Sequence, residues 1–444
     1  MTTFSFKQIL LSSLWLIVAM SASAQLTQRI TIQEAIDLGL KNSKALRITQ
    51  AKSDVSKAKY QQQFATAIPA VSLTSQYQHL STNVDEIKFQ TGPGRYGTIG
   101  VSIHDQFLNT LGISQVIFAG MRGFNLLKAS KDQMRASQYD IERDKADTKN
   151  SIITAYYNQY KLLESKKVVE ENLNVAQRRL KDIKNMQAAG MALRNDVLKV
   201  DLSISNLEQT ATEVQSAIEV SNFNLATMLG LPDGTNIELV DAGLFSAKRT
   251  FDTKAGFQNA LNQRPELKAA DMRIAASQKQ LQVTKGIYSP VISAGFNYYY
   301  SKPNQRVFIE DQIRFHDTWD IGVRLSWNIT NLFTTQFQTR EAKANLIQSN
   351  TVKEQLEENI RMEVNTNYAA YRLALDKIQL TEKALDQAKE NQSLTKNQYD
   401  NGVKNIADML DADNLFTTTQ INLLNAKIDA EVAYTKLLKA IGNN

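Results

Sequence analysis

The sequence predicts a mainly α-helical protein with a small transmembrane β part. Three observations predict this fold class. A stretch at 190–230 returns at 402–442, two long segments contain neither glycine nor proline, and four short segments alternate apolar with polar residues. Together they predict duplicated long coiled-coil helices that carry one small sheet.

The repeat keeps its length in both copies, which lie 212 positions apart. From Val197 to Ile218 apolar residues step by 3 and 4 positions, and most of their counterparts in the second copy are apolar too. This spacing places an apolar stripe along one side of a helix, which must meet another helix to be buried. The shared positions are Gly190/Gly402, Asp196/Asp408, Leu198/Leu410, Asp201/Asp413, Leu225/Leu437 and Gly230/Gly442.

The N-terminal segment predicts export from the cytoplasm. Residues 1–24 have a positive start at Lys7, an apolar centre and small residues before a cleavage site after Ala24, which together indicate a secretory signal. Beyond it, no window approaches the run of about 20 apolar residues that a membrane-spanning helix needs. The chain has no cysteine, which excludes disulfides, thiolate metal sites and a lipid on an N-terminal cysteine.

The charges of the chain do not indicate a nucleic-acid partner. The formal net charge is +6, but lysine and arginine alternate with aspartate and glutamate along the predicted helices. No basic stripe therefore forms, and we expect no nucleic-acid binding.

The first structural repeat is predicted over 25–230. It begins with a helix from Thr31 to about residue 67, and Glu34 stands where a capping box with Thr31 requires it. Within the following hairpin, a loop is expected at about 81–98 and a second strand somewhere in 99–118. The later elements are expected as a β-hairpin at 70–118, a long helix at 121–189 and a helix at 191–229.

A linker at 231–251 separates the two repeats, and the second repeat, at 252–444, follows the same plan. Pro290 ends its first helix at the corner where Pro69 ends that of the first repeat. Its elements are expected as a helix at 252–288, a β-hairpin at 291–329, a long helix at 332–401 and a helix at 403–441. Each pair of long helices joined by a glycine turn should lie antiparallel.

The strands have one apolar face and one polar face. On the apolar face, aromatic residues stand towards both ends of strands about ten residues long, which is typical of the aromatic girdles of an outer-membrane barrel. The polar face suits a water-filled lumen. The predicted girdle residues are Tyr298, Tyr299, Tyr300, Trp319 and Trp327.

Four strands cannot close into a membrane barrel, because the smallest known ones have about eight and an open edge is not tolerated in lipid. The strands must therefore be pooled between chains. Two chains would give eight strands and three chains twelve, and a conducting pore favours the larger number because small barrels are filled by side chains.

The two repeats, the order of helices and hairpins, and a twofold Gly-x5-Asp-x-Leu-x2-Asp signature resemble the TolC family of outer-membrane efflux proteins. The resemblance covers almost the whole mature chain. It implies a homotrimer in the cell outer membrane with one twelve-stranded β-barrel and a long periplasmic extension, an α-helical barrel. It further implies a passive exit duct that works with a periplasmic adaptor and an inner-membrane pump, in tripartite efflux or type I secretion.

The same resemblance implies a gate near the glycine turns. The signature places Asp408 and Asp411 on ring positions at a lumen constriction, and residues three apart share one helix face. It places a latch of the closed state at Tyr399 and Lys404, with Asn195 and Asp196 opposite. Lys404 stands where the family has arginine, so the bidentate fork of a guanidinium is missing there.

Two further readings concern the same residues. Asp196 and Asp408 lie six residues after a turn glycine, where an acid also stabilises the start of a helix. Gly190 and Gly402 are expected to form the turns themselves and to present them to the adaptor.

No enzyme activity, cofactor or metal is expected. The G-x-G-x-x-G pattern at 92–97 lies in a predicted strand-to-strand loop rather than between a strand and a helix, as a dinucleotide site requires. The three histidines are scattered, and no catalytic constellation converges. The alternative from another class is a soluble periplasmic coiled-coil scaffold or adaptor, which has no need for aromatic girdles. The transported substrate stays open.

Overall fold

The computed structural model describes residues 27–81, 87–99, 104–240, 251–304, 306 and 314–443. The predicted signal segment and the second half of the predicted linker lie outside the described residues. The described chain forms two compact units. The first comprises the segments up to Gln50, Asp140–Leu267 and from Leu356 onwards, and the second comprises Ala51–Tyr139 and Lys268–Gln355.

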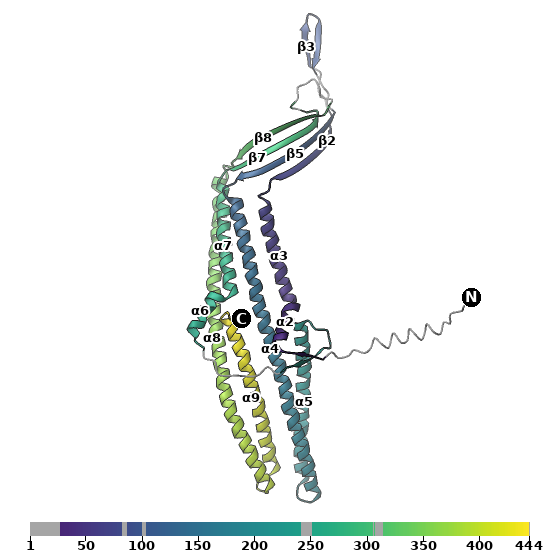
Figure 1. Ribbon diagram of the computed structural model, residues 1–444, viewed down its shortest axis with the longest axis vertical. Helices are drawn as coiled ribbons and strands as arrows, with labels where there is room; N and C mark the ends of the chain where they lie inside the picture. Colours follow the sequence, from purple (N-terminus) through teal and green to yellow (C-terminus); the bar gives the residue numbers. More distant parts are fainter. Residues whose placement is uncertain are drawn as a thin grey trace, which may run out of the picture. The chain divides into compact units, whose positions relative to one another are not determined.

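Four long helices follow the predicted plan (Figure 1). Most positions of the predicted apolar stripes are buried or half-buried, and Val200 and Ala430 have no exposed surface. The fold class predicted from the repeat and its periodicity is therefore confirmed. The four helices are α4 (Arg122–Ala188), α5 (Arg194–Leu229), α8 (Asn331–Asp400) and α9 (Ile406–Ala440).

A glycine turn joins the two helices of each pair. Gly190 and Gly402 have φ angles of +76° and +73°, a conformation that costs a residue with a Cβ about 1–2 kcal/mol. After each helix the chain bonds back in the same way: Met191 N donates to Met186 O, and Val403 N to Gln398 O, both at 2.8 Å. These bonds satisfy carbonyls that the helix end would leave unpaired.

The four predicted strands form one antiparallel sheet. Its order is β2-β5-β7-β8, so the hairpins of the two repeats pair side by side through β5 and β7 (Figure 1). The strands are β2 (Ala70–His79), β5 (Asp105–Phe118), β7 (Val291–Lys302) and β8 (His316–Ser326).

The prediction of a loop at 81–98 is wrong in part. It contains a second small hairpin, β3 (Ile87–Gly92) and β4 (Arg95–Ile99), which also takes Ile99 out of the strand expected in 99–118. The glycines and proline that predicted a loop form the hairpin's turn, where Gly94 has a φ angle of +75°. The expected strand positions Val101 and Ile103 lie outside the described residues.

The first helix of each repeat is interrupted, where the sequence predicts one continuous helix. In the first repeat the break is at Ser43, between α2 (Ile32–Asn42) and α3 (Lys44–Ala65), and Ser43 Oγ accepts a hydrogen bond from Leu46 N. In the second it is at Arg264, between α6 (Thr253–Gln263) and α7 (Pro265–Lys285). The proline that follows Arg264 disfavours helical backbone at that residue, which explains the break. The capping box of Thr31 and Glu34 is present.

A short parallel pair in the first unit was not predicted. Strand β1 (Thr27–Ile30) pairs with β6 (Asn236–Leu239), and Arg29 and Glu238 form two hydrogen bonds of 2.9 Å across it. Tyr156, fully buried in α4, places its hydroxyl 3.2 Å from Ile30 O and 2.8 Å from Val240 O. The expected linker therefore begins with a strand that is fixed to the helical core.

Two glycines meet in the second unit where strands and helices join. A Cβ at Gly120 would lie 2.4 Å from Gly286 O, and a Cβ at Gly286 would lie 2.5 Å from Gly120 O. Gly120 comes just after β5, and Gly286 opens the short 3-10 helix Gly286–Tyr288 after α7. This corner admits only glycine at both positions.

Candidate functional site

The apolar face of the sheet is exposed. Opposed residues of neighbouring strands share a face, so the strand register defines rows of side chains that cross all four strands. Val323 and Ile321 on β8 are 71% and 74% exposed, and Leu73 on β2 is 76% exposed. Two such rows are Val71–Ile113–Phe296–Ile321 and Leu73–Leu111–Tyr298–Trp319.

The opposite face is polar. A further row is Ser72–Gly112–Asn297–Asp320, and the next is Thr74–Thr110–Tyr299–Thr318. Tyr299 therefore lies on the polar face, apart from the other predicted girdle residues, because successive side chains of a strand alternate between faces. Trp327 follows the last residue of β8, and its Nε1 donates to Tyr288 O at 3.1 Å.

Trp319, Tyr298 and Tyr300 lie on the apolar face. Tyr298 and Trp319 are directly opposed, Tyr300 lies two residues along on the same face, and all three side chains are exposed. In the described residues, no helix combines the length and apolar character that a membrane crossing requires. The apolar rows of this sheet thus form an exposed surface across its four strands.

The predicted gate residues lie at the start of α9. Asp408 accepts a hydrogen bond from Asn405 N and donates its own N–H to Asn405 Oδ1, which is a complete capping box. Asp196 likewise accepts a bond of 3.2 Å from Leu193 N at the start of α5. The capping alternative is therefore present for both acids. Asp411, one turn later, is exposed and takes no part in the cap.

The predicted latch residues are close together but not joined as expected. Lys404 lies in the turn before α9, with its Nζ 3.7 Å from Asp408 Oδ1, and in the described part of the chain no bond links it to Asn195 or Asp196. Tyr399 is partly buried against the apolar cluster of the turns. Burial raises the pKa of its hydroxyl, Asp196 adds to this rise, and Arg179 opposes it. The charges of an acid and a base of the other helix pair therefore both act on Tyr399.

A partly buried ion pair joins the helix pairs instead. Arg179 of α4 pairs with Asp413 of α9, and their side chains are only 15% and 19% exposed. Gln392 of α8 donates to the same carboxylate at 2.8 Å. Burial lowers the pKa of Arg179. Sequence reasoning missed this pair, although Asp413 is a signature position, because Arg179 is one cation among many on a charged helix.

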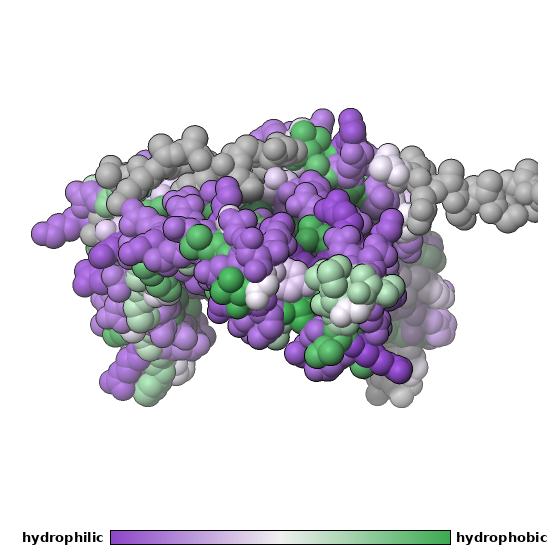
Figure 2. Space-filling view, turned by 90° about the horizontal axis from the view of Figure 1, so that it is seen from below, coloured by the Kyte–Doolittle hydropathy of each residue, from purple (hydrophilic) through white to green (hydrophobic). Residues whose placement is uncertain are grey.

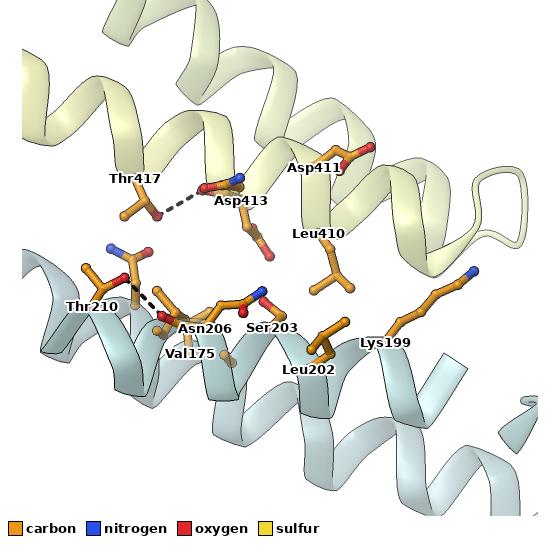
Figure 3. A pocket seen from close by; sticks show the side chains of 14 residues that line it. Val175, Lys199, Leu202, Ser203, Asn206, Thr210, Leu410, Asp411, Asp413 and Thr417 are labelled. Atoms are coloured by element: carbon orange, nitrogen blue, oxygen red, sulfur yellow. Dashed lines mark hydrogen bonds between the residues drawn. The ribbon is translucent and has the colours of Figure 1, made fainter. Parts of the chain in front are cut away.

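A groove of about 270 Å³ lies beside this pair, between α4, α5 and α9. In Figure 3, Leu410 and Asp413 of α9 point towards α5, while the Asp411 carboxylate points away from it. Thr417 Oγ1 donates to Asp413 O at 2.9 Å. The groove is lined by amides, hydroxyls and charged groups together with apolar side chains such as Val175, Leu202 and Leu410.

The surface around the helix turns is largely hydrophilic (Figure 2). Met191, Leu193 and Val403, next to the two turn glycines, are exceptions at 69–73% exposure. Within the described residues, no group of three or more histidine, aspartate or glutamate side chains is placed to hold a metal ion.

Comparison with known proteins places these features in one family. The model of the outer membrane efflux protein family matches residues 35–231 and 256–443, one match for each repeat. The outer membrane efflux protein BepC of Brucella suis is 22% identical over 78% of this chain and 72% of its own length. The toluene efflux pump outer membrane protein TtgC of Pseudomonas putida is 22% identical over 93% of this chain and 82% of its own length.

Solved structures show the same fold. The chain is similar to the channel protein CusC, with a TM-score of 0.78 and 18% identity over 93% of this chain and 92% of that one. It is also similar to the outer membrane protein VceC of Vibrio cholerae, with a TM-score of 0.76 and 17% identity over 93% of this chain and 96% of that one.

Proposed function

Since the chain belongs to the outer membrane efflux protein family, and is thus an efflux channel of the cell outer membrane, we propose that three copies of it form one duct. Each copy contributes its four-stranded sheet to a closed barrel of twelve strands. The duct is passive: it conducts substrates outward and carries no catalytic centre or cofactor.

One observation carries this proposal. The sheet exposes an apolar face and a polar face, and β2 and β8 form its two edges. Unpaired backbone groups at a strand edge cost several kcal/mol each in lipid, so the edges must pair with those of other copies. Three copies give a lumen wide enough to conduct, whereas a barrel of about eight strands is filled by its own side chains.

The experiment that tests the proposal is the native mass of the mature protein after extraction from outer membranes in mild detergent. We expect a mass of three chains. A soluble monomer in the periplasm would contradict the proposal and favour the alternative of a soluble scaffold. A dimer would support an eight-stranded barrel instead.

We further propose that the helical part extends into the periplasm and that its turns, at Gly190 and Gly402, contact a periplasmic adaptor bound to an inner-membrane pump. The exposed apolar side chains Met191, Leu193 and Val403 supply contact area there. The names of two relatives mention toluene and pyoverdine, so the named substrates differ between relatives. We propose that the pump selects the substrate.

We propose a constriction at Asp411 and Asp408, where three copies would bring their carboxylates to one axis. Carboxylates in a narrow pore attract cations. Because Asp408 also caps α9, Asp411→Asn is the more specific test of the constriction: it removes a carboxylate and leaves the cap in place. We expect it to weaken the block of the current by multivalent cations in a planar bilayer.

Asp201→Asn is the matched control for that test, because Asp201 is an exposed acid on α5 and the same charge is removed. The block should be unchanged in this variant. An Asp411→Asn channel that is blocked as strongly as the wild type would exclude Asp411 from the constriction.

A further inference from the structure

The chain folds back onto the polar face of the sheet directly after β7. Asn304 is 5% exposed, and its Nδ2 donates to His316 O at 3.0 Å and to Thr318 Oγ1 at 3.1 Å. Its Oδ1 accepts a bond of 3.1 Å from Arg306 N. Because Thr318 points to the polar face, Asn304 and the backbone next to it cover that face.

Arg306 extends this contact along the same face. Its guanidinium lies 2.5 Å from Asp320 Oδ2 and 4.2 Å from the centre of the Tyr299 ring. Asp320 also accepts a bond of 2.9 Å from Asn297 Nδ2. A guanidinium that pairs with a carboxylate and stacks on an aromatic ring is held in one place.

This contact alters the charge of the polar face. Among the described residues of the four strands, Asp320 is the one acidic side chain on that face, and Arg324, four residues along β8, is the one basic side chain. Without Arg306, Asp320 would present an uncompensated carboxylate. Arg306 therefore compensates the one negative charge that the described residues of the strands place on this face.

We propose that Asn304 and Arg306 lie inside the lumen of the barrel and that the pair of Arg306 with Asp320 sets the ion selectivity of the exit. The inference rests on the proposed function, because the polar face becomes a lumen only when copies pool their strands. Three copies would bring three such pairs to one level of the pore. With its carboxylates neutralised, that level does not favour cations.

The reversal potential across a planar bilayer under a KCl gradient tests the proposal. Arg306→Gln uncovers Asp320, so we expect the permeability ratio of potassium to chloride to rise above that of the wild type. Asp320→Asn leaves Arg306 uncompensated and should lower the ratio. The double variant should return towards the wild-type value, because both charges of the pair are then absent.

Lys302→Gln is the matched control. Lys302 lies four residues before Arg306, carries the same charge and belongs to the apolar face, since it is opposed to Phe107. It should leave the ratio unchanged. A conducting wild-type trimer in which Arg306→Gln has no effect, or in which Lys302→Gln shifts the ratio equally, would overturn the inference and leave the proposed function standing.

Thiol labelling tests the position of Arg306 independently of charge. The chain has no cysteine, so Arg306→Cys carries a single thiol. We expect a bulky water-soluble thiol reagent to reduce the current of Arg306→Cys and to leave that of Lys302→Cys unchanged. Modification that leaves the Arg306→Cys current intact would place residue 306 outside the lumen. Wild-type protein that forms no conducting trimer would overturn the proposed function, and this inference with it.

Discussion

At the scale of single residues, the two helix pairs are held together by few polar contacts, and the pair of Arg179 with Asp413 is the most buried of them at the turns. Removing one partner of a partly buried ion pair leaves a charge with less compensation, at a cost that approaches about 3–5 kcal/mol when burial is complete. If the closed state depends on this pair, its loss shifts the duct towards the open state.

We therefore predict that Asp413→Asn raises the basal conductance of the duct in a planar bilayer. Lys396→Gln is the control, because it breaks an ion pair with Asp400 in which both side chains are more than half exposed. Such pairs contribute about 0–1 kcal/mol, so its conductance should stay at the wild-type level. Equal conductance of Asp413→Asn and the wild type would show that the pair of Arg179 with Asp413 does not stabilise the closed state.

The residues that the sequence predicts well are those with local partners. The capping box of Thr31 and Glu34 follows from a spacing of three, and the capping alternative for Asp408 follows from its position six residues after a turn glycine. Pairs such as Arg179 with Asp413 or Arg306 with Asp320 depend on how distant or irregular segments meet. The sequence holds many charged residues, and nothing in it indicates which acid a given arginine will contact. These pairs could therefore not be predicted.

At the scale of elements, the corner of Gly120 and Gly286 is a close approach of backbone to backbone. Gly120 has a φ angle of +65°, and the space that a Cβ would need is taken by Gly286 O and Ser289. We predict that Gly120→Ala lowers the stability of the protein by about 2 kcal/mol or more, from the left-handed backbone and the overlap together.

Gly123→Ala is the control for that prediction. Gly123 lies in the first turn of α4, and a Cβ there would meet nothing within 4 Å. Thermal unfolding of the detergent-extracted protein should show a lowered midpoint for Gly120→Ala only. A similar midpoint for both variants would mean that the corner relaxes at little cost.

Elements with strong periodicity were predicted, and short ones were not. The alternation along β8 and the spacing along α5 persist over many residues, whereas β1 and β6 have four residues each. The β3–β4 hairpin was hidden because its turn residues are also typical of loops. The breaks at Ser43 and Arg264 interrupt helices whose apolar pattern continues on both sides, so the pattern does not indicate them. Pro265 is a local sign of the second break.

At the scale of the whole molecule, membrane insertion depends on the one extended apolar face. Leu73 and Thr74 are neighbours on β2, but Leu73 belongs to the apolar face and Thr74 to the polar face. A lysine on the lipid face of a membrane barrel costs up to about 2–4 kcal/mol, whereas a lysine in the lumen remains in water.

We predict that Leu73→Lys reduces the amount of trimer recovered from outer membranes, while Thr74→Lys leaves it close to the wild type. Quantifying the trimer in outer-membrane extracts measures both. Equal recovery of the two variants would show that the apolar face does not meet lipid.

The parallel pairing of β1 with β6 has a consequence for the timing of folding. Arg29 and Glu238 are 209 positions apart, so the first strand has no partner until about half of the chain has followed it. Closing so large a loop is slow, because its entropy is lost before the contact forms. During export, β1 therefore stays an unpaired strand that proteases and chaperones can reach. Folding of the N-terminal strand is thus a late event, because it requires residues 236–240.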